Sequence, residues 1–87
     1  MNETELKTKL KEIVIDVTHS SDEVEDIEDT DFLIDDLGVD SLGMIDLVTK
    51  LERHFKIEIP QGEVILQNFK SIELLSTYIG SKITGLP

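Results

Sequence analysis

The chain is 87 residues long, which predicts one domain, and its 19 acidic and 8 basic residues give a formal net charge of −11. So acidic a chain repels phosphate backbones, which argues against a nucleic-acid partner. The absence of cysteine excludes disulfides and thiolate metal sites, and no apolar stretch has the length of a membrane span. We therefore expect a single cytoplasmic domain over residues 1–87, monomeric and not inserted in a membrane.

The negative charge is concentrated in one segment. Residues 19–40 hold ten acidic residues and no Lys or Arg, whereas residues 1–18 carry a net charge of −1 and residues 41–87 are neutral overall. Charge of one sign on a surface attracts partners of the opposite sign. Proteins that bind this chain are therefore expected to present basic patches.

A first helix is predicted over about residues 4–18, with Asn2 or Thr4 as its cap, because apolar residues recur at helical spacing. The apolar stripe consists of Leu6, Leu10, Ile13, Val14 and Val17. No period persists over residues 19–40, so a long acidic loop is expected there. Five apolar residues would attach this loop to the bundle. They are Val24, Ile27, Phe32, Leu33 and Leu37.

A second helix is predicted to begin at Asp40 or Ser41 and to end at about Phe55. Its core face should hold Met44, Leu47, Val48, Leu51 and Phe55. On a wheel of about 100° per residue, Leu42 and Ile45 fall away from that face. We therefore expect both side chains to be partly exposed.

The last third of the chain predicts a short helix followed by a long one. Ile57–Pro60 should be extended, and the apolar run Val64–Leu66 indicates a short third helix. Ser71 can cap a last helix that Gly80 weakens or ends early. Its inward face should hold Ile72, Leu74, Leu75, Tyr78, Ile79 and Ile83. The predicted fold is all-α: a small bundle of three main helices plus one short helix, with the long acidic loop between the first and second.

The run from Asp36 to Leu42, Asp-Leu-Gly-Val-Asp-Ser-Leu, places a serine where the loop meets the second helix. Gly38 allows a tight turn, and that turn delivers Ser41 to a helix N-terminus, where the helix dipole tolerates a phosphate. Ser and Asp are also the commonest helix caps, so capping alone could explain this pair. The exposed apolar residues Leu42 and Ile45 indicate instead a docking surface beside the serine.

At this motif the sequence resembles the acyl carrier proteins, whose Leu-Gly-x-Asp-Ser-Leu pattern is matched by residues 37–42. The likeness extends over nearly the whole chain. It comprises a helix, a long acidic loop, a helix ending in a pattern of Leu51, Glu52 and Phe55, an Ile-Pro pair, a short helix and a last helix. A three-residue motif alone is weak support, but motif, length, acidity and element order agree.

The resemblance implies that Ser41 carries a 4'-phosphopantetheine arm, which a phosphopantetheinyl transferase moves from coenzyme A onto the hydroxyl. The thiol at the end of the arm would hold acyl groups as thioesters, passed between enzymes of fatty-acid, polyketide or related biosynthesis. The chain itself would be a carrier and not an enzyme. By the same likeness, the transferase and the acyl-transferring and acyl-modifying enzymes would contact Asp40, Leu42, Ile45 and Asp46.

Two alternatives stay open beside an acyl carrier. A small acidic helical adaptor would bind a basic partner without a cofactor. A peptidyl or D-alanyl carrier would use the same serine, although the acidity and the Asp-Ser-Leu form favour the acyl type. The second helix also departs from the family, since Gly43 stands where many members have an acid and Thr49 where many are apolar. Its second half is basic, with Lys50, Arg53, His54 and Lys56. These departures fit surface drift or a carrier dedicated to its own partners.

No metal site and no catalytic residue are predicted. The acidic run that starts at Asp29 has Ile34 and Asp40 where an EF-hand needs Gly and Glu. His19 and His54 lack a zinc-ligand pattern, and His19 fits a helix C-terminus instead. Nothing in the sequence places a base beside the serine of the motif for a catalytic triad.

Overall fold

The computed structural model describes residues 2–84. Its elements are α1 (Glu3–Thr18), the 3₁₀ turn η1 (Val24–Asp26), α2 (Ser41–Phe55), the 3₁₀ turn η2 (Gln61–Glu63), α3 (Leu66–Phe69) and α4 (Ile72–Thr84). Within these residues no strand forms, and an isolated β-bridge joins Phe32 to Ser71. The prediction of an all-α fold with three main helices and one short helix is confirmed.

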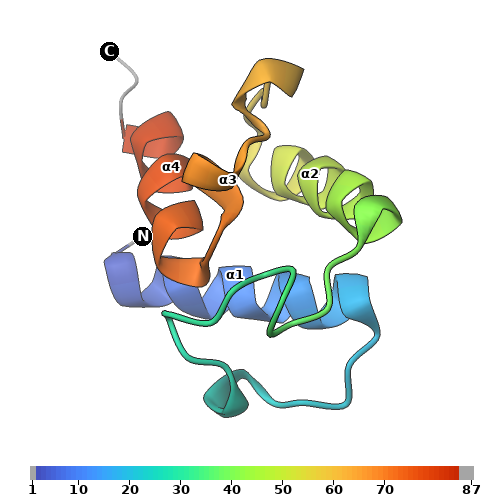
Figure 1. Cartoon of the computed structure of the whole chain (residues 1–87). Coiled ribbons are helices and arrows are strands. Elements are labelled where there is room, and N and C mark those ends of the chain that lie inside the picture. The colour runs from blue at the N-terminus through green and yellow to red at the C-terminus, as the bar shows by residue number, and fades with distance from the viewer. Residues whose placement is uncertain (1, 85–87) are drawn as a thin grey trace.

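The long helices meet around one apolar core. α1 packs against both α2 and α4, and α3 packs against α4 (Figure 1). The helical residues buried there are Leu6, Leu10, Val14, Val17, Leu47, Leu51, Phe69, Ile72, Leu75 and Ile79. The predicted stripes of α1 and α2 therefore face the core. Their outer members Ile13, Met44, Val48 and Phe55 are only partly buried, because they lie at the edge of each stripe.

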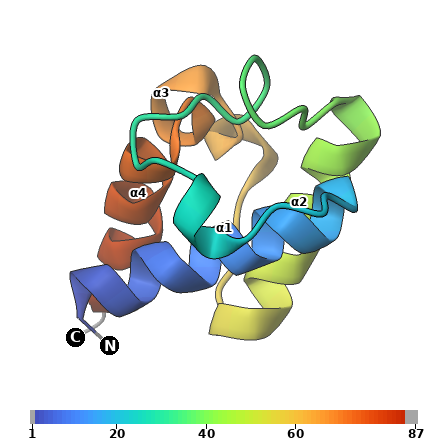
Figure 2. The same ribbon diagram turned by 90° about the horizontal axis from the view of Figure 1, so that it is seen from below.

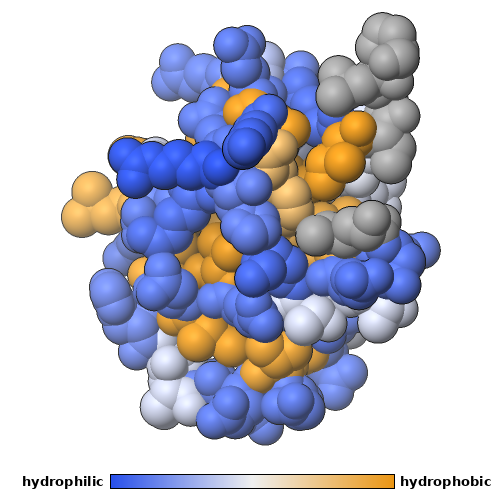
Figure 3. Space-filling view, turned by 180° about the vertical axis from the view of Figure 1, so that it is seen from behind, coloured by the Kyte–Doolittle hydropathy of each residue, from blue (hydrophilic) through white to orange (hydrophobic). Residues whose placement is uncertain are grey.

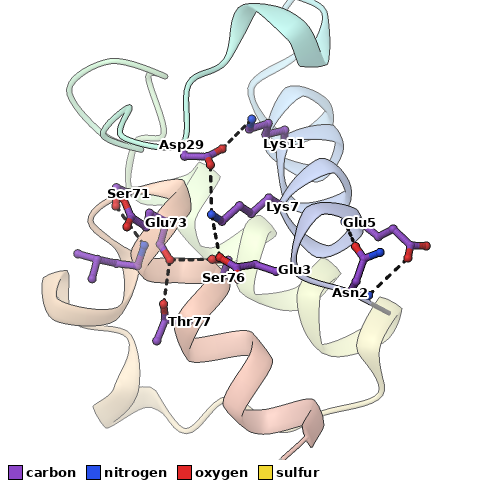
Figure 4. Close-up of polar contacts among 11 residues, drawn as sticks. Asn2, Glu3, Glu5, Lys7, Lys11, Asp29, Ser71, Glu73, Ser76 and Thr77 are labelled. Atoms are coloured by element: carbon purple, nitrogen blue, oxygen red, sulfur yellow. Dashed lines mark hydrogen bonds and ion pairs between the residues drawn. The ribbon is translucent and has the colours of Figure 1, made fainter.

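Both ends of α1 are closed by local hydrogen bonds. Asn2 is the cap: its side-chain oxygen accepts the Glu5 amide at 2.8 Å, and the Glu5 carboxylate accepts the Asn2 amide at 3.4 Å (Figure 4). This reciprocal pair satisfies amides that a helix start leaves without partners. At the other end His19 has a left-handed φ of 55°, and its amide donates to the carbonyl of Asp16. His19 thus lies at the helix C-terminus, as expected.

The acidic loop leaves α1, runs back along it to the start of α4, and returns to α2 (Figures 1 and 2). Ile27 and Leu33 of the loop are buried in the core, which confirms its attachment through apolar side chains. Backbone hydrogen bonds add to this attachment. The Glu73 amide donates to the Asp29 carbonyl at 2.9 Å, and the Leu33 amide donates to the Lys70 carbonyl at 3.0 Å.

Charge also fastens this loop to α1. The Asp29 carboxylate lies 2.9 Å from Lys11 Nζ and 3.2 Å from Lys7 Nζ (Figure 4). The hydrogen bond from Lys11, and then that from Lys7, hold the pKa of Asp29 below its usual value. Lysines on α1 therefore offset part of the repulsion among the loop carboxylates.

The last third of the chain differs in detail from the prediction. α3 begins at Leu66 and not at Val64, because Ile65 is extended and α3 starts only after it. Gly80 does not end α4, which continues to Thr84. A glycine inside a helix costs about 1 kcal/mol, and burial of the apolar face of α4 outweighs that cost. The predicted Ser71 cap is confirmed, since its hydroxyl accepts the Leu74 amide at 3.2 Å.

Two residues predicted to face inward lie at the surface. Leu74 is 40% exposed and Phe32 is 39% exposed, with Lys70 Nζ covering the Phe32 ring at 5.1 Å. Figure 3 shows apolar side chains in several places between hydrophilic ones. A chain of this size cannot bury all of its apolar surface. Over residues 2–84, no helix combines the length and the apolar character needed to cross a membrane.

Candidate functional site

The approach to α2 is fixed by Gly38 and Val39. Gly38 has a φ of 77°, a left-handed conformation that favours glycine, which confirms the predicted turn. Its amide donates to the Ile34 carbonyl at 3.2 Å, and the Val39 amide donates to the Leu33 carbonyl at 2.9 Å. The Val39 side chain is 1% exposed. Val39 therefore anchors the chain in the core directly before Asp40. The sequence did not predict this role, because a single apolar residue between Gly38 and Asp40 forms no pattern.

The sequence left open whether Asp40 and Ser41 only cap the helix or present a reactive hydroxyl. In the structure these two roles belong to different residues. Asp40 is the cap of α2, because its Oδ1 accepts the Gly43 amide at 2.7 Å. Ser41 is the first residue of the helix and is exposed. Among residues 2–84, its hydroxyl has no hydrogen-bond partner. Capping therefore does not account for Ser41, and its hydroxyl is available for chemistry.

The position of this hydroxyl suits a negatively charged substituent. Ser41 and Leu42 lie in the first turn of α2, where backbone amides lack acceptors within the helix. The first bond of the helix runs from the Met44 amide to the Asp40 carbonyl at 2.8 Å. The amides of the first turn and the positive end of the helix dipole both favour an anion, and a phosphate ester on Ser41 would lie beside them.

The two faces of α2 confirm the predicted phase of the helix. Leu47 and Leu51 are fully buried, whereas Leu42 is 78% exposed and Ile45 is 65% exposed. Both exposed residues lie within about one turn of Ser41. The serine is therefore flanked by apolar side chains that the described chain leaves largely exposed.

Asp46 lies at the border between these faces and is half-buried. Lys50 Nζ is 3.2 Å from Asp46 Oδ1 and 3.6 Å from Asp16 Oδ2 of α1. The hydrogen bond with Asp46 raises the pKa of Lys50. Part of the charge of Asp46 is thus met within the chain, which reduces the field that it presents to a partner.

An apolar cleft of about 570 Å³ opens beside Ser41. Its lining residues come from the end of the loop, the first turns of α2, and the segment that contains α3. They are Ile34, Val39, Asp40, Ser41, Met44, Ile45, Val64, Ile65, Leu66 and Phe69. Asp40 and Ser41 are the polar members of this lining. The sequence did not reveal this cleft, because an apolar run as short as residues 64–66 has no resolvable period and is interpreted as helix.

The remaining candidate residues lie in separate local structures. His19 ends α1, and the His54 ring contacts the neighbouring Phe55 ring edge-on at 4.7 Å between centroids. In the described part of the chain, no three His, Cys, Asp or Glu side chains are grouped to hold a metal ion. The Ser41 hydroxyl likewise has no base as a hydrogen-bond partner within residues 2–84.

Comparison with known proteins identifies the family of this chain. The family model described as "Phosphopantetheine attachment site" matches residues 8–79, a range that includes Ser41. An acyl carrier protein of Clostridium perfringens is 37% identical over 71 residues, which cover 82% of this chain and 88% of that protein. One of Thermosynechococcus vestitus is 32% identical over 85 residues, covering 98% of this chain and all of that protein.

This chain belongs to the acyl carrier protein family. As a member it takes 4'-phosphopantetheine as its prosthetic group, which supplies a thiol at the end of a flexible arm. The residues at the start of α2 fit such a group, since an exposed hydroxyl lies beside first-turn amides and an apolar cleft. A further relative, "Aminoacyl carrier protein 2" of Bradyrhizobium diazoefficiens, is 36% identical over 44 residues, covering 51% of this chain and 49% of that protein.

Proposed function

We propose that this member of the acyl carrier protein family binds its 4'-phosphopantetheine arm at Ser41 and carries acyl groups on it as thioesters. The observation that carries the proposal is the exposed hydroxyl of Ser41, which has no hydrogen-bond partner among residues 2–84 while Asp40 caps the helix. A serine needed as a cap would lose that role on esterification. Here the cap and the acceptor are different residues.

The attachment step leaves no chemistry for the chain itself to catalyse. The Ser41 oxygen forms a bond to the phosphorus that bears pantetheine in coenzyme A, the bond between the two phosphates breaks, and adenosine 3',5'-bisphosphate leaves. The hydroxyl proton passes to a base of the transferase, because no base of the chain is bonded to the Ser41 hydroxyl in the described part of the structure. The protein is in this proposal a monomeric cytoplasmic carrier and not an enzyme.

The cleft beside Ser41 favours an acyl cargo over an aminoacyl one. Its lining is apolar except for Asp40 and Ser41, and burying a charged amino group against such a lining is costly. An alkyl chain, by contrast, gains about 0.8 kcal/mol for each methylene removed from water. The proposed cargo is therefore an acyl intermediate of fatty-acid, polyketide or related biosynthesis.

The surface around Ser41 supports a docking role for Asp40, Leu42, Ile45 and Asp46. Leu42 and Ile45 offer apolar contact, and the two carboxylates offer charge for partners with basic patches. The proposed partners are the phosphopantetheinyl transferase and the enzymes that load, modify and unload the acyl group. Because Lys50 already contacts Asp46, we expect Asp40 and the apolar pair to contribute more than Asp46.

The proposal is tested by the mass of the chain after incubation with coenzyme A and a broad-specificity phosphopantetheinyl transferase. The wild type should gain one phosphopantetheine, and Ser41→Ala should gain none. Ser21→Ala and Ser81→Ala are matched controls, since both serines are exposed, and both variants should be modified normally. A folded wild type that stays unmodified would instead favour a cofactor-free acidic adaptor.

A further inference from the structure

One wall of the apolar cleft is fastened to α4 by a polar contact. The residue before this wall is Glu63 of η2. Its Oε1 accepts a hydrogen bond from the Tyr78 hydroxyl, with 2.5 Å between the two oxygens, and lies 2.9 Å from Lys82 Nζ. We call these three residues the Glu63 clasp. Val64, Ile65 and Leu66 follow directly and line the cleft.

The same tyrosine also contacts Phe69, which follows the wall in sequence and itself lines the cleft. The ring of Tyr78 lies against the ring of Phe69, with 5.7 Å between centroids. Between these points, the Asn68 side chain donates to the Glu63 carbonyl at 2.9 Å and closes the segment on itself. Tyr78 therefore contacts the residue directly before the wall and a residue shortly after it.

Contacts with α4 help to position this wall. α3 packs against α4, α4 packs against α1, and α1 packs against α2. The cleft lies between the two ends of this series, α2 and the segment that contains α3. A contact that holds η2 and α3 on α4 therefore also holds the wall at its distance from α2.

The chemistry of the clasp keeps it closed near neutral pH. The hydrogen bond from Tyr78 and the contact with Lys82 lower the pKa of Glu63, so its carboxylate stays ionised. Burial and the nearby Glu63 charge raise the pKa of Tyr78, so its hydroxyl keeps its proton. A charged acceptor with a neutral donor gives a strong hydrogen bond.

We propose that Tyr78, acting through Glu63, is a positioning residue that holds the Val64–Leu66 wall in place, so that the cleft is preformed for an acyl chain carried on Ser41. This inference rests on the function proposed above. The cleft is already open while the clasp is closed. A preformed wall spares the acyl chain the entropic cost of ordering that segment when it binds.

The test compares two cargoes on the same protein. Wild type and Tyr78→Phe are loaded at Ser41 with an acetyl or an octanoyl arm, using the corresponding acyl-coenzyme A and the transferase, and the melting temperature of each form is measured. Tyr78→Phe removes the hydroxyl but keeps the ring that contacts Phe69. In the wild type the octanoyl form should melt higher than the acetyl form, because a chain bound in the cleft stabilises the native state. Tyr78→Phe should lose most of that difference.

Three further variants separate positioning from ordinary stability. Ser76→Ala removes another hydroxyl of α4, which donates to the Glu73 carbonyl at 2.7 Å and does not line the cleft. This variant should shift the melting temperatures of the acetyl and octanoyl forms equally. Glu63→Gln keeps an acceptor for Tyr78 and should retain more of the octanoyl gain than Tyr78→Phe does. Lys82→Met removes the ion pair with Glu63 and the cation over the Tyr78 ring but keeps the tyrosine hydroxyl, and it should give an intermediate loss.

The outcomes distinguish this inference from the proposed function. An equal melting shift in the acetyl and octanoyl forms of both Tyr78→Phe and Lys82→Met overturns the positioning role. A wild type that loads normally but gains nothing from octanoyl also overturns it, while leaving Ser41 as the attachment residue. Failure of any cargo to attach at Ser41 overturns the proposed function, and the inference with it.

Discussion

The two faces of α2 use the same kinds of side chain for opposite purposes. Leu47 and Leu51 are fully buried against the rest of the bundle, while Leu42 and Ile45 are 78% and 65% exposed a few residues away. The difference comes from what lies opposite each face, because α1 packs against the side of Leu47 and Leu51, whereas Leu42 and Ile45 lie on a side that stays largely open. Exposure and not residue type therefore separates the side chains that stabilise the fold from those offered to partners.

The largest loss of stability is expected from a change on the buried face of α2. Leu51→Ala should lower the free energy of unfolding by roughly 2–5 kcal/mol, because it removes fully buried methyl groups and leaves a cavity. Denaturant titration measures this loss, which is a large share of the stability of a small domain. A change of a few tenths of a kcal/mol would mean that α2 is packed differently.

A smaller loss of stability is expected at Asp40, the cap of α2. Asp40→Ala should cost about 0.5–2 kcal/mol, because the Gly43 amide loses its side-chain acceptor. Asp40→Asn keeps an acceptor oxygen and should cost less, and Ser41→Ala should have almost no effect on stability. Thermal melts of the three variants check this order. A larger loss in Ser41→Ala than in Asp40→Ala would assign the cap to the serine.

The ion pair of Asp46 and Lys50, at the border of the two faces, should make the stability of the fold depend on pH. The pKa of Lys50 is raised by its hydrogen bond with Asp46. The ion pair therefore stabilises the fold fully below the unfolded-state pKa of lysine and loses its contribution as the pH rises through the higher folded-state pKa. Asp46→Asn should make the fold slightly less stable at neutral pH and reduce the loss of stability between neutral pH and about pH 11. Melts at the two pH values measure this, and an unchanged alkaline loss would contradict it.

The smallest effect on stability is expected on the exposed face. Leu42→Ala should change the free energy of unfolding by no more than about 0.5 kcal/mol, as is usual for exposed positions. The same variant should slow transfer of the arm onto Ser41, because it removes apolar contact area beside the acceptor. Single-turnover modification rates test this against Thr49→Ala, an exposed control further along α2. Unfolding of Leu42→Ala would overturn the assignment of the two faces.

The sequence determined the phase of α2 because five apolar residues at helical spacing leave one consistent buried face. It could not decide between Asp40 and Ser41 as the cap, since both are good capping residues and only the bond to Gly43 separates them. It also missed the cleft. Val64 and Ile65 are brought opposite α2 by tertiary contacts of Glu63 and Phe69, and such contacts leave no local pattern.

The separation of cap and acceptor at the start of α2 has an energetic consequence. Because Asp40 and not Ser41 holds the Gly43 amide, esterification of Ser41 breaks no bond that the fold depends on. The chain with its arm should therefore be at least as stable as the chain without it, because no native bond is lost and the phosphate lies beside the amides of the first turn. Attachment of the arm then needs no local unfolding of α2.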